Sequence, residues 1–419
     1  MTLVCILFAL FGAPLFAVIA AAALAGFHSE GVDLSVVAIE IYRLAETPVL
    51  LAIPLFTFAG YVLGESGAPQ RLVRLSNALL GWLPGGLAIV AVVTCALFTA
   101  FTGASGVTIV ALGALLYPAL KQAGYRPRFG LGLVTSSGSL GILFAPSLPL
   151  ILYGVVAQSL GARVNIDDLF VAGILPGTLM LVLLAGYCML QTRDGSAALQ
   201  AFSRVEAWRA LRASMPEIPL PFIVLGGIYG GYLAVSEAAA VTALYVLLVE
   251  VAMRREIEWA RLPAVMRESM TLVGGILIIL GVSLASTNYM IDTELPTRIF
   301  DTIREYIDDK LTFLIALNVF LLVLGMMLDI FSALVIMIPI ILPIALDYGV
   351  NPLHLGIVFL ANMQLGYFTP PVGMNLFIAS YRFDKSIVEL CLATWPFFLL
   401  LLIAVAVITY WPALSTALL

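Results

Sequence analysis

Asp329 is the residue whose type and position most directly suggest chemistry, because it stands in the middle of the apolar stretch 311–346. An acid at the centre of a membrane costs about 2.5–3.5 kcal/mol on an insertion scale, so a carboxylate at that depth points to a function. Ser332 follows at the spacing of a helix N-cap and its third residue, so Asp329 could also cap a helix. The two roles are compatible, since a capping carboxylate can also bind a cation.

The segment 101–108, in the middle of another apolar run, combines hydroxyl and glycine residues. Gly103 and Gly106 permit a tight reversal of the chain there. Ser105 and Thr108 are placed to cap the helix that returns from the reversal. Carbonyls freed at such a reversal, together with nearby hydroxyls, suit a hard cation. Plain helix packing through small residues is the alternative interpretation.

Two further apolar segments, 135–147 and 362–375, are interrupted by proline and contain uncharged polar residues. Proline interrupts the hydrogen-bond ladder of a helix, so each segment predicts a broken helix. A half-helix that begins near Ser147 would present free N–H groups and a positive dipole end, which suits a carboxylate. The hydroxyl and amide side chains in these segments that need a partner or a cavity include Ser136, Ser139, Ser147, Asn362, Gln364, Thr369 and Asn375.

The segment 118–146 returns 225 positions later, without a gap, as 343–371. Most of the identities at this offset are glycine or proline, the residues that decide where a helix ends or breaks. The repetition indicates a protein built from two copies of one unit, each with a broken helix. Secondary transporters have this architecture.

The composition places the chain in a membrane, because 62% of its 419 residues are hydrophobic and only 11% are charged. A soluble domain carries about 25% charged residues. The net charge of −5 belongs to the loops and does not indicate nucleic-acid binding. The four cysteines lack the spacing of metal ligands, and no phosphate-binding loop or hydrolase motif is present. An intramembrane enzyme is disfavoured, since Asp329 is the single acid at membrane depth.

Apolar runs predict nine crossings and two further segments, 86–120 and 311–346, each of which is either a re-entrant hairpin or a pair of thin spans. We treat both as hairpins. With this arrangement, 15 of the 20 Lys and Arg residues fall in loops on one side. Positive loops remain in the cytoplasm, so the N-terminus is predicted to be cytoplasmic and the C-terminus periplasmic. The predicted crossings are 3–27, 48–64, 129–158, 168–190, 217–235, 237–253, 268–290, 353–380 and 386–411.

These elements predict an all-α polytopic membrane protein with two inverted repeats, 1–190 and 237–419, joined by a connector and linker helix at 191–236. The first repeat contains hairpin 86–120 and broken helix 129–158. The second contains hairpin 311–346 and broken helix 353–380. The single linker helix turns the second copy over, so the hairpins enter from opposite faces. The segment 69–82 predicts an amphipathic helix whose Arg71 and Arg74 lie among lipid headgroups.

Several motifs, in this order and over nearly the whole chain, resemble the large membrane subunit of tripartite ATP-independent periplasmic (TRAP) transporters. They are 102–108, Gly141 with 145–147, 236–240, 325–329 and 366–375. The resemblance implies sodium-driven uptake of a small organic acid anion by an elevator-type carrier in the bacterial inner membrane. It also implies two partners, a small four-helix membrane subunit, expected as a separate chain, and a periplasmic substrate-binding protein.

The same resemblance implies sodium sites between each hairpin and its broken helix, with substrate between the two tips. Sodium is the co-transported ion, and no cofactor is expected. A self-sufficient sodium-coupled dicarboxylate symporter, or an ion antiporter without a binding protein, is the alternative. The implied substrate residues are Ser139, Ser147, Asn362, Gln364, Gly373 and Asn375, and the implied sodium residues are Gly103, Ser105, Thr108, Ser136, Gly138, Asp329, Ser332, Gly366 and Thr369.

Overall fold

The computed structural model describes residues 13–191 and 202–419, which form helices and turns without a strand. Within these ranges seven helices are long and apolar enough to cross a membrane, or eight if the bent pair Pro127–Leu143 and Leu148–Ser159 counts as one span. The predicted first span, 3–27, lies partly outside the described residues. Its second half belongs to α2 (Leu15–Ser29), which α3 (Ser35–Ala45) follows.

After α3, the first half continues with the short turn η1 (Pro48–Leu51) and a series of helices separated by sharp breaks. These are α4 (Ala52–Glu65), α5 (Ala68–Leu80), α6 (Gly86–Thr102), α7 (Ser105–Ala111), α8 (Gly113–Gln122), α9 (Pro127–Ser137), the 3₁₀ turn η2 (Leu140–Leu143), α10 (Leu148–Ser159) and α11 (Ile166–Gln191).

The linker and the second half continue the chain with a similar series. The linker contains α12 (Arg204–Ala213) and α13 (Pro219–Tyr229). The second half contains α14 (Val235–Val246), the π turn η3 (Leu247–Met253), α15 (Leu262–Asp292), α16 (Leu295–Arg304), α17 (Lys310–Met327), α18 (Ile330–Asp347), α19 (Pro352–Gly366), α20 (Met374–Phe383), α21 (Ile387–Tyr410) and α22 (Ala413–Thr416).

Helices of the two halves begin at nearly constant separations along the chain. The first residues of α6, α7, α9 and α10 precede those of α17, α18, α19 and α20 by 224, 225, 225 and 226 positions. These separations match the offset of the repeated glycine and proline pattern. Both halves therefore have the same order: a helix, a reversal, a returning helix and a broken helix.

The linker helix is shorter than the predicted crossing 217–235. Its apolar part, α13, has 11 residues, a length of about 16 Å, whereas a bilayer core is about 30 Å thick. The chain then turns at Gly230 and Gly231, the latter with φ +70°. In addition, α17 and α18 of the predicted hairpin 311–346 are each long and apolar enough to cross a membrane. The helix lengths in the described ranges therefore do not reproduce the predicted count of nine crossings.

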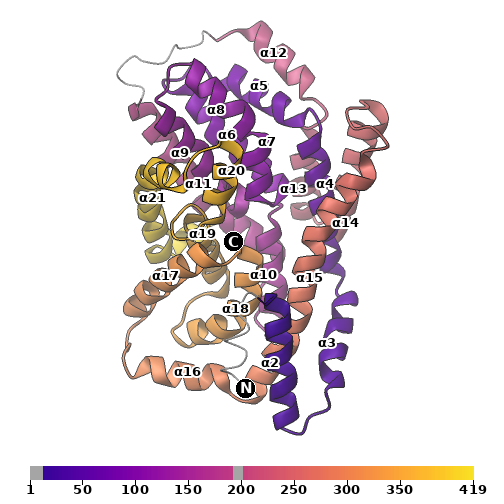
Figure 1. Ribbon diagram of the computed structural model, residues 1–419, viewed down its shortest axis with the longest axis vertical. Helices are drawn as coiled ribbons and strands as arrows, with labels where there is room; N and C mark the ends of the chain where they lie inside the picture. Colours follow the sequence, from indigo (N-terminus) through magenta and orange to yellow (C-terminus); the bar gives the residue numbers. More distant parts are fainter. Residues whose placement is uncertain (1–12, 192–201) are drawn as a thin grey trace.

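The described helices pack around two main apolar cores. The larger core joins residues of the two reversals, the broken helices, α11 and α21. A smaller core is made by α4, the end of α14 and the start of α15. In Figure 1, α14 and α15 run along the right-hand side of the molecule, while α9, α19 and α21 lie on the left. The protein therefore has a helical layer beside the larger body that contains both reversals.

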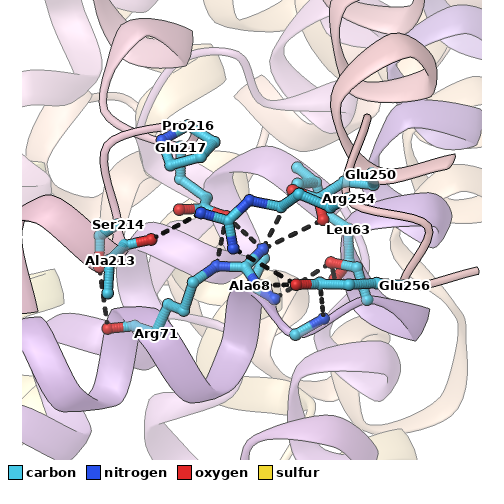
Figure 2. Close-up of polar contacts among 12 residues, drawn as sticks. Leu63, Ala68, Arg71, Ala213, Ser214, Pro216, Glu217, Glu250, Arg254 and Glu256 are labelled. Carbon is cyan, nitrogen blue, oxygen red and sulfur yellow. Dashed lines mark hydrogen bonds and ion pairs between the residues drawn. The ribbon is translucent and has the colours of Figure 1, made fainter. Parts of the chain in front are cut away.

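Arg71 is buried, with 9% of its surface exposed, and does not lie among lipid headgroups as the sequence predicts. Its Nε donates to Glu217 at 2.7 Å, and its Nη2 lies 3.1 Å from both carboxylate oxygens of Glu250. Its Nη1 contacts Glu256 at 2.5 Å, and Arg254 reaches the same carboxylate at 3.3 Å (Figure 2). The prediction was wrong because these acids come from the linker, from η3 and from the loop that follows η3, far away in sequence.

The Arg71 cluster, defined as Arg71, Glu217, Glu250, Arg254 and Glu256, attaches α5 to the smaller core. Burial acts to raise the pKa of Glu256, but hydrogen bonds from the N–H of Gly67 and from Arg71 outweigh it and lower this pKa to about 2. The carboxylates in turn raise the pKa of Arg71, although its burial acts in the opposite direction. The ionised forms of Arg71 and Glu256 therefore stabilise one another in the folded protein.

Candidate functional site

A cavity of about 690 Å³ lies where the two reversals meet the smaller core. One wall contains the reversal between α6 and α7, and another contains the reversal between α17 and α18. The structure thus brings together two segments that are more than 200 residues apart. The lining includes Tyr61, Glu65, Gly103, Ala104, Ser105, Gly106, Val107, Ile142, Glu268, Leu272, Asp329, Ile330, Phe331, Tyr367, Met374 and Ile378.

Gly103 ends α6 with φ +65° and begins the first reversal. A Cβ at this position would lie 2.5 Å from the Leu148 side chain, so both the conformation and the available space favour glycine. The predicted caps are not formed, because α7 has Ala104 as its N-cap and no side chain accepts its first N–H groups. Ser105 is buried and lines the cavity.

Thr99, which the sequence did not single out, connects the first reversal to the first broken helix. Its hydroxyl donates to the carbonyl of Gly138 at 2.8 Å and lies 2.6 Å from the hydroxyl of Thr108. Because Thr99 gives its single proton to Gly138, Thr108 donates to Thr99. Two of the predicted cation residues, Thr108 and Gly138, thus meet through Thr99. Ser136 does not join them, since its hydroxyl donates to Gly132 within its own helix at 2.8 Å.

Asp329 caps the second reversal as predicted. Its Oδ1 accepts from the backbone N–H groups of Phe331 and Ser332, each at 3.0 Å. Ser332 contributes its backbone N–H to this cap and not its hydroxyl. Asp329 lines the cavity and remains partly exposed there. Both capping bonds use one carboxylate oxygen, so the other oxygen of Asp329 is left for a ligand.

Gly141 and Gly366 allow each broken helix to pack against the backbone of its hairpin. A Cβ at Gly141 would lie 2.2 Å from the carbonyl oxygen of Ala96. At Gly366 it would lie 2.4 Å from the carbonyl carbon of Gly325. Close packing therefore accounts for Gly366, which the resemblance assigns to a sodium site. The breaks themselves contain the cis bonds Ala145–Pro146 and Pro370–Pro371.

Four predicted substrate residues carry buried polar atoms that have no hydrogen-bond partner among the described residues. They are Ser147 Oγ, Asn362 Oδ1, both amide atoms of Gln364, and Asn375 Oδ1. Such atoms are rare in folded proteins and call for an explanation, such as an ion, water or ligand. None of the four residues belongs to the lining of the 690 Å³ cavity, whose nearest members in sequence are Tyr367 and Met374.

The structure separates one of these four residues from the others. The amide of Asn362 donates to Asn318 at 2.6 Å, and Asn318 also accepts from Thr409 at 3.1 Å. Asn362 therefore faces α17 and α21. By contrast, Ser139 lies 3.5 Å from the carbonyl of Gln364, so the two broken helices meet at those residues.

The remaining predicted residues have roles in the second break. Thr369 donates to Leu365 at 2.7 Å within its own turn. Gly373, with φ +39°, donates its N–H to Met326 at 3.0 Å and so attaches the break to the hairpin. Across the described ranges, no cluster of three or more His, Cys, Asp or Glu residues could hold a metal ion. A cation in the cavity would thus be bound by carbonyls and hydroxyls together with Asp329, and Glu65 and Glu268 also line this cavity.

The fold is similar to that of solved transporters at low sequence identity. The crystal structure of the Alcanivorax borkumensis YdaH transporter superimposes with a TM-score of 0.63, at 16% identity, over 91% of this chain and 88% of that one. Neisseria gonorrhoeae MtrF, described as one of a class of antimetabolite efflux pumps, gives a TM-score of 0.55 at 13% identity, over 87% of this chain and 80% of that one. At these identities the likeness concerns the fold alone.

Sequence relatives are closer. The isethionate TRAP transporter permease protein DctMQ of Oleidesulfovibrio alaskensis is 34% identical over 97% of this chain, which spans 64% of that longer protein. The C4-dicarboxylate TRAP transporter large permease protein DctM of Rhodobacter capsulatus is 32% identical over 94% of this chain and 91% of its own length.

The ectoine TRAP transporter large permease protein TeaC of Halomonas elongata is 29% identical over 87% of this chain and 85% of its own length. These relatives are named as transport proteins and not as enzymes. A family model described as tripartite ATP-independent periplasmic transporter, DctM component, matches residues 1–414. The chain therefore belongs to the DctM family of TRAP transporter membrane components.

Proposed function

We propose that this chain carries a small organic acid anion across the bacterial inner membrane together with sodium, and receives the anion from a periplasmic substrate-binding protein. The observation that carries the proposal is that both reversals, one with Gly103 and the other with Asp329, line a single cavity. Each reversal packs against a broken helix, and secondary transporters bind substrate and ions at such breaks. The names of the isethionate, C4-dicarboxylate and ectoine relatives support a small polar solute.

Two cation sites are proposed, one at each reversal. The first contains the polar contact of Thr99, Thr108 and Gly138, with Gly103 and Ser105 beside it. The second contains the free oxygen of Asp329 and carbonyls near the break after Gly366. Asp329 corresponds to Ala104 at the offset of 225, so the two reversals differ by one full negative charge. The second site is therefore the one at which a charge change has the larger effect.

Substrate is proposed to bind near the crossing of the two broken helices. Ser147, Gln364 and Asn375 bring buried polar atoms without partners to this region. The side chain of Ser147, the N-cap of α10, accepts no N–H from that helix. The first turn of α10 therefore keeps N–H groups and a positive dipole end for a carboxylate.

We further propose that the two halves are inverted repeats and that the larger body moves as an elevator against the smaller core. Ser139 and Gln364 are equivalent at the offset of 225 and touch each other. A residue can contact its own repeat equivalent where the two copies face each other across a pseudo-two-fold axis. Gly60 of α4 supports close sliding contact, because a Cβ there would lie 2.5 Å from the backbone of Thr102.

The proposed partners are a small four-helix membrane subunit and a periplasmic binding protein, and the word tripartite in the name of the family supports two further components. In this arrangement the N-terminus is cytoplasmic and the C-terminus periplasmic. If purified chain and small subunit take up the substrate at full rate without a binding protein, the chain is instead a self-sufficient symporter. That outcome would leave the cation sites in place and remove the periplasmic partner from the proposal.

Uptake should depend on sodium. Two sodium ions that enter with a monoanion carry one net charge, so 100 mV supplies about 2.3 kcal/mol, roughly a fiftyfold gradient, in addition to the sodium gradient. We expect proteoliposomes to accumulate an anion that the binding protein recognises when external salt is sodium chloride. Undiminished uptake after full replacement by potassium chloride at the same pH would refute sodium coupling.

The two halves should be inverted across the membrane. Gln122 and Asp347 are equivalent at the offset of 225, and both are exposed at the ends of the returning helices. We expect Gln122→Cys to react with an impermeant maleimide only from the cytoplasm and Asp347→Cys only from outside. Asp347 is preferable to Asn351, whose side chain caps α19. Labelling of both cysteines from the same face would rule out the inversion.

A further inference from the structure

Tyr367 is the first residue after α19 and connects the second reversal to the second break. Its buried hydroxyl accepts the backbone N–H of Ile330 at 2.7 Å. Its own carbonyl accepts the backbone N–H of Asn375 at 2.8 Å. One residue therefore holds the hairpin with its side chain and the segment after the break with its main chain.

The hydroxyl of Tyr367 completes the cap that Asp329 begins. Ile330 provides the first N–H of α18, and Asp329 accepts the next two, from Phe331 and Ser332. The first N–H groups of a helix have no partner within the helix, so these three bonds together define where α18 begins. The position of the Asp329 carboxylate consequently depends on the hydroxyl of Tyr367.

The other side of Tyr367 leads to the substrate region. Asn375 carries one of the buried amide oxygens that have no partner among the described residues, and Met374 beside it lines the cavity. A second hydrogen bond, from the N–H of Gly373 to the carbonyl of Met326, also joins the hairpin to the segment after the break. The residue equivalent to Tyr367 in the first half is Ile142, which has no hydroxyl. The contact of a tyrosine hydroxyl with the first N–H of the returning helix is thus specific to the second half.

We propose that Tyr367 is a positioning residue that couples cation binding at Asp329 to the position of the segment Gly373–Asn375. This inference rests on the proposed sodium site and adds the route by which that site reaches the substrate region. A cation bound by Asp329 favours one placement of the cap, and the Tyr367 hydroxyl transmits that placement to the break. Coupling of this kind is reciprocal, so a ligand at Asn375 also favours cation binding.

Sodium alone can test the coupling, without knowledge of the substrate. Met374 is 39% exposed, so a cysteine there can report on the segment through its rate of reaction with a maleimide. The background protein carries Cys5→Ser and Cys391→Ser, since Cys95 and Cys188 are buried. The full chain, purified in detergent, is labelled in sodium chloride and in potassium chloride at equal ionic strength. Thermal unfolding is measured in the same two salts.

With Tyr367 present, we expect sodium to change the labelling rate of Met374→Cys and to raise the unfolding temperature. A net hydrogen bond corresponds to roughly a two- to twelvefold change in an equilibrium, which sets the size of the rate ratio between the salts. In Tyr367→Phe the ratio should fall close to one, while the sodium-dependent rise in unfolding temperature remains. A structural role alone would lower the unfolding temperature in both salts and leave the ratio unchanged.

Tyr153→Phe is the matched control. The hydroxyl of Tyr153 likewise bonds to the backbone, although here it donates to the carbonyl of Pro352 at 2.5 Å, and the residue is fully buried in a broken helix. Tyr153→Phe removes the same hydroxyl oxygen at a position outside the cap of α18. This variant should therefore keep the ratio of labelling rates between the two salts. An unchanged ratio in Tyr367→Phe would overturn the coupling alone. If sodium changes neither the labelling rate nor the unfolding temperature of the background protein, the proposed sodium site is refuted, and the coupling that depends on it is refuted as well.

Discussion

Replacing Arg71 with methionine should destabilise the protein by about 3–5 kcal/mol, the usual cost of removing one partner from a buried ion pair. Methionine retains the length of the apolar stem but leaves Glu217 and Glu250 buried without their cation. It also releases α5 from the smaller core, to which the Arg71 cluster attaches it. The measurement is the free energy of unfolding, or the unfolding temperature, of the purified chain at pH 7.

Arg74→Met provides the control on the same helix. Arg74 lies three residues further along α5 and pairs with Glu206 at 2.7 Å, but the two side chains are 50% and 43% exposed. An exposed pair contributes about 0–1 kcal/mol, so this substitution should barely lower the unfolding temperature. Equal losses for the two variants would mean that the contacts of the Arg71 cluster, drawn in Figure 2, do not act as a buried attachment of α5.

The difference in stability between the wild type and Arg71→Met should depend on pH, and the sign of this dependence follows from the pKa of Glu256. The pKa of Glu256 is lowered to about 2 in the folded protein, from an ordinary value of 4.5. Its contribution to stability is therefore fully present above about pH 4.5 and is lost as the pH falls towards 2. The stability gap between the wild type and Arg71→Met should narrow as the pH is lowered through this window.

The order of elements could be predicted from the sequence because glycine and proline act locally. The repeat at 118–146 and 343–371 set out the returning helices and the breaks, and the structure contains α8, α9, α18 and α19 at the corresponding positions. Asp329 was predictable as a cap for the same reason, since a cap depends on residues two and three positions away. Its place in the cavity additionally required the two reversals to meet, which the repeat alone does not show.

Contacts between distant segments could not be predicted in this way. The amphipathic pattern of 69–82 gives no sign that Arg71 is buried, because its partner Glu217 is 146 positions away. Likewise, hydroxyl residues at 135–139 look equivalent in sequence, but Ser136 bonds to its own helix while Ser139 faces Gln364. Which way each hydroxyl points depends on the packing of the neighbouring helix.

Asp329→Asn should abolish sodium-driven uptake or raise the sodium concentration for half-maximal uptake at least about tenfold. Asparagine keeps a side-chain oxygen and is about as good an N-cap as aspartate, so α18 should still begin at the same residue. The substitution removes one full negative charge from a partly enclosed cavity. Even about 1.4 kcal/mol lost at one ion raises its dissociation constant tenfold.

Asp309→Asn is the control that separates helix capping by Asp329 from cation binding by Asp329. Asp309 caps α17, where it accepts the N–H of Thr312 at 2.9 Å, but it is exposed and lies outside the cavity. If capping is all that matters, both substitutions should leave uptake and its sodium dependence close to those of the wild type. If Asp329 also binds the cation, only Asp329→Asn should shift the sodium dependence, at an expression level and unfolding temperature similar to those of Asp309→Asn. Wild-type sodium dependence in Asp329→Asn would restrict this acid to its structural role and leave the second cation site without its charge.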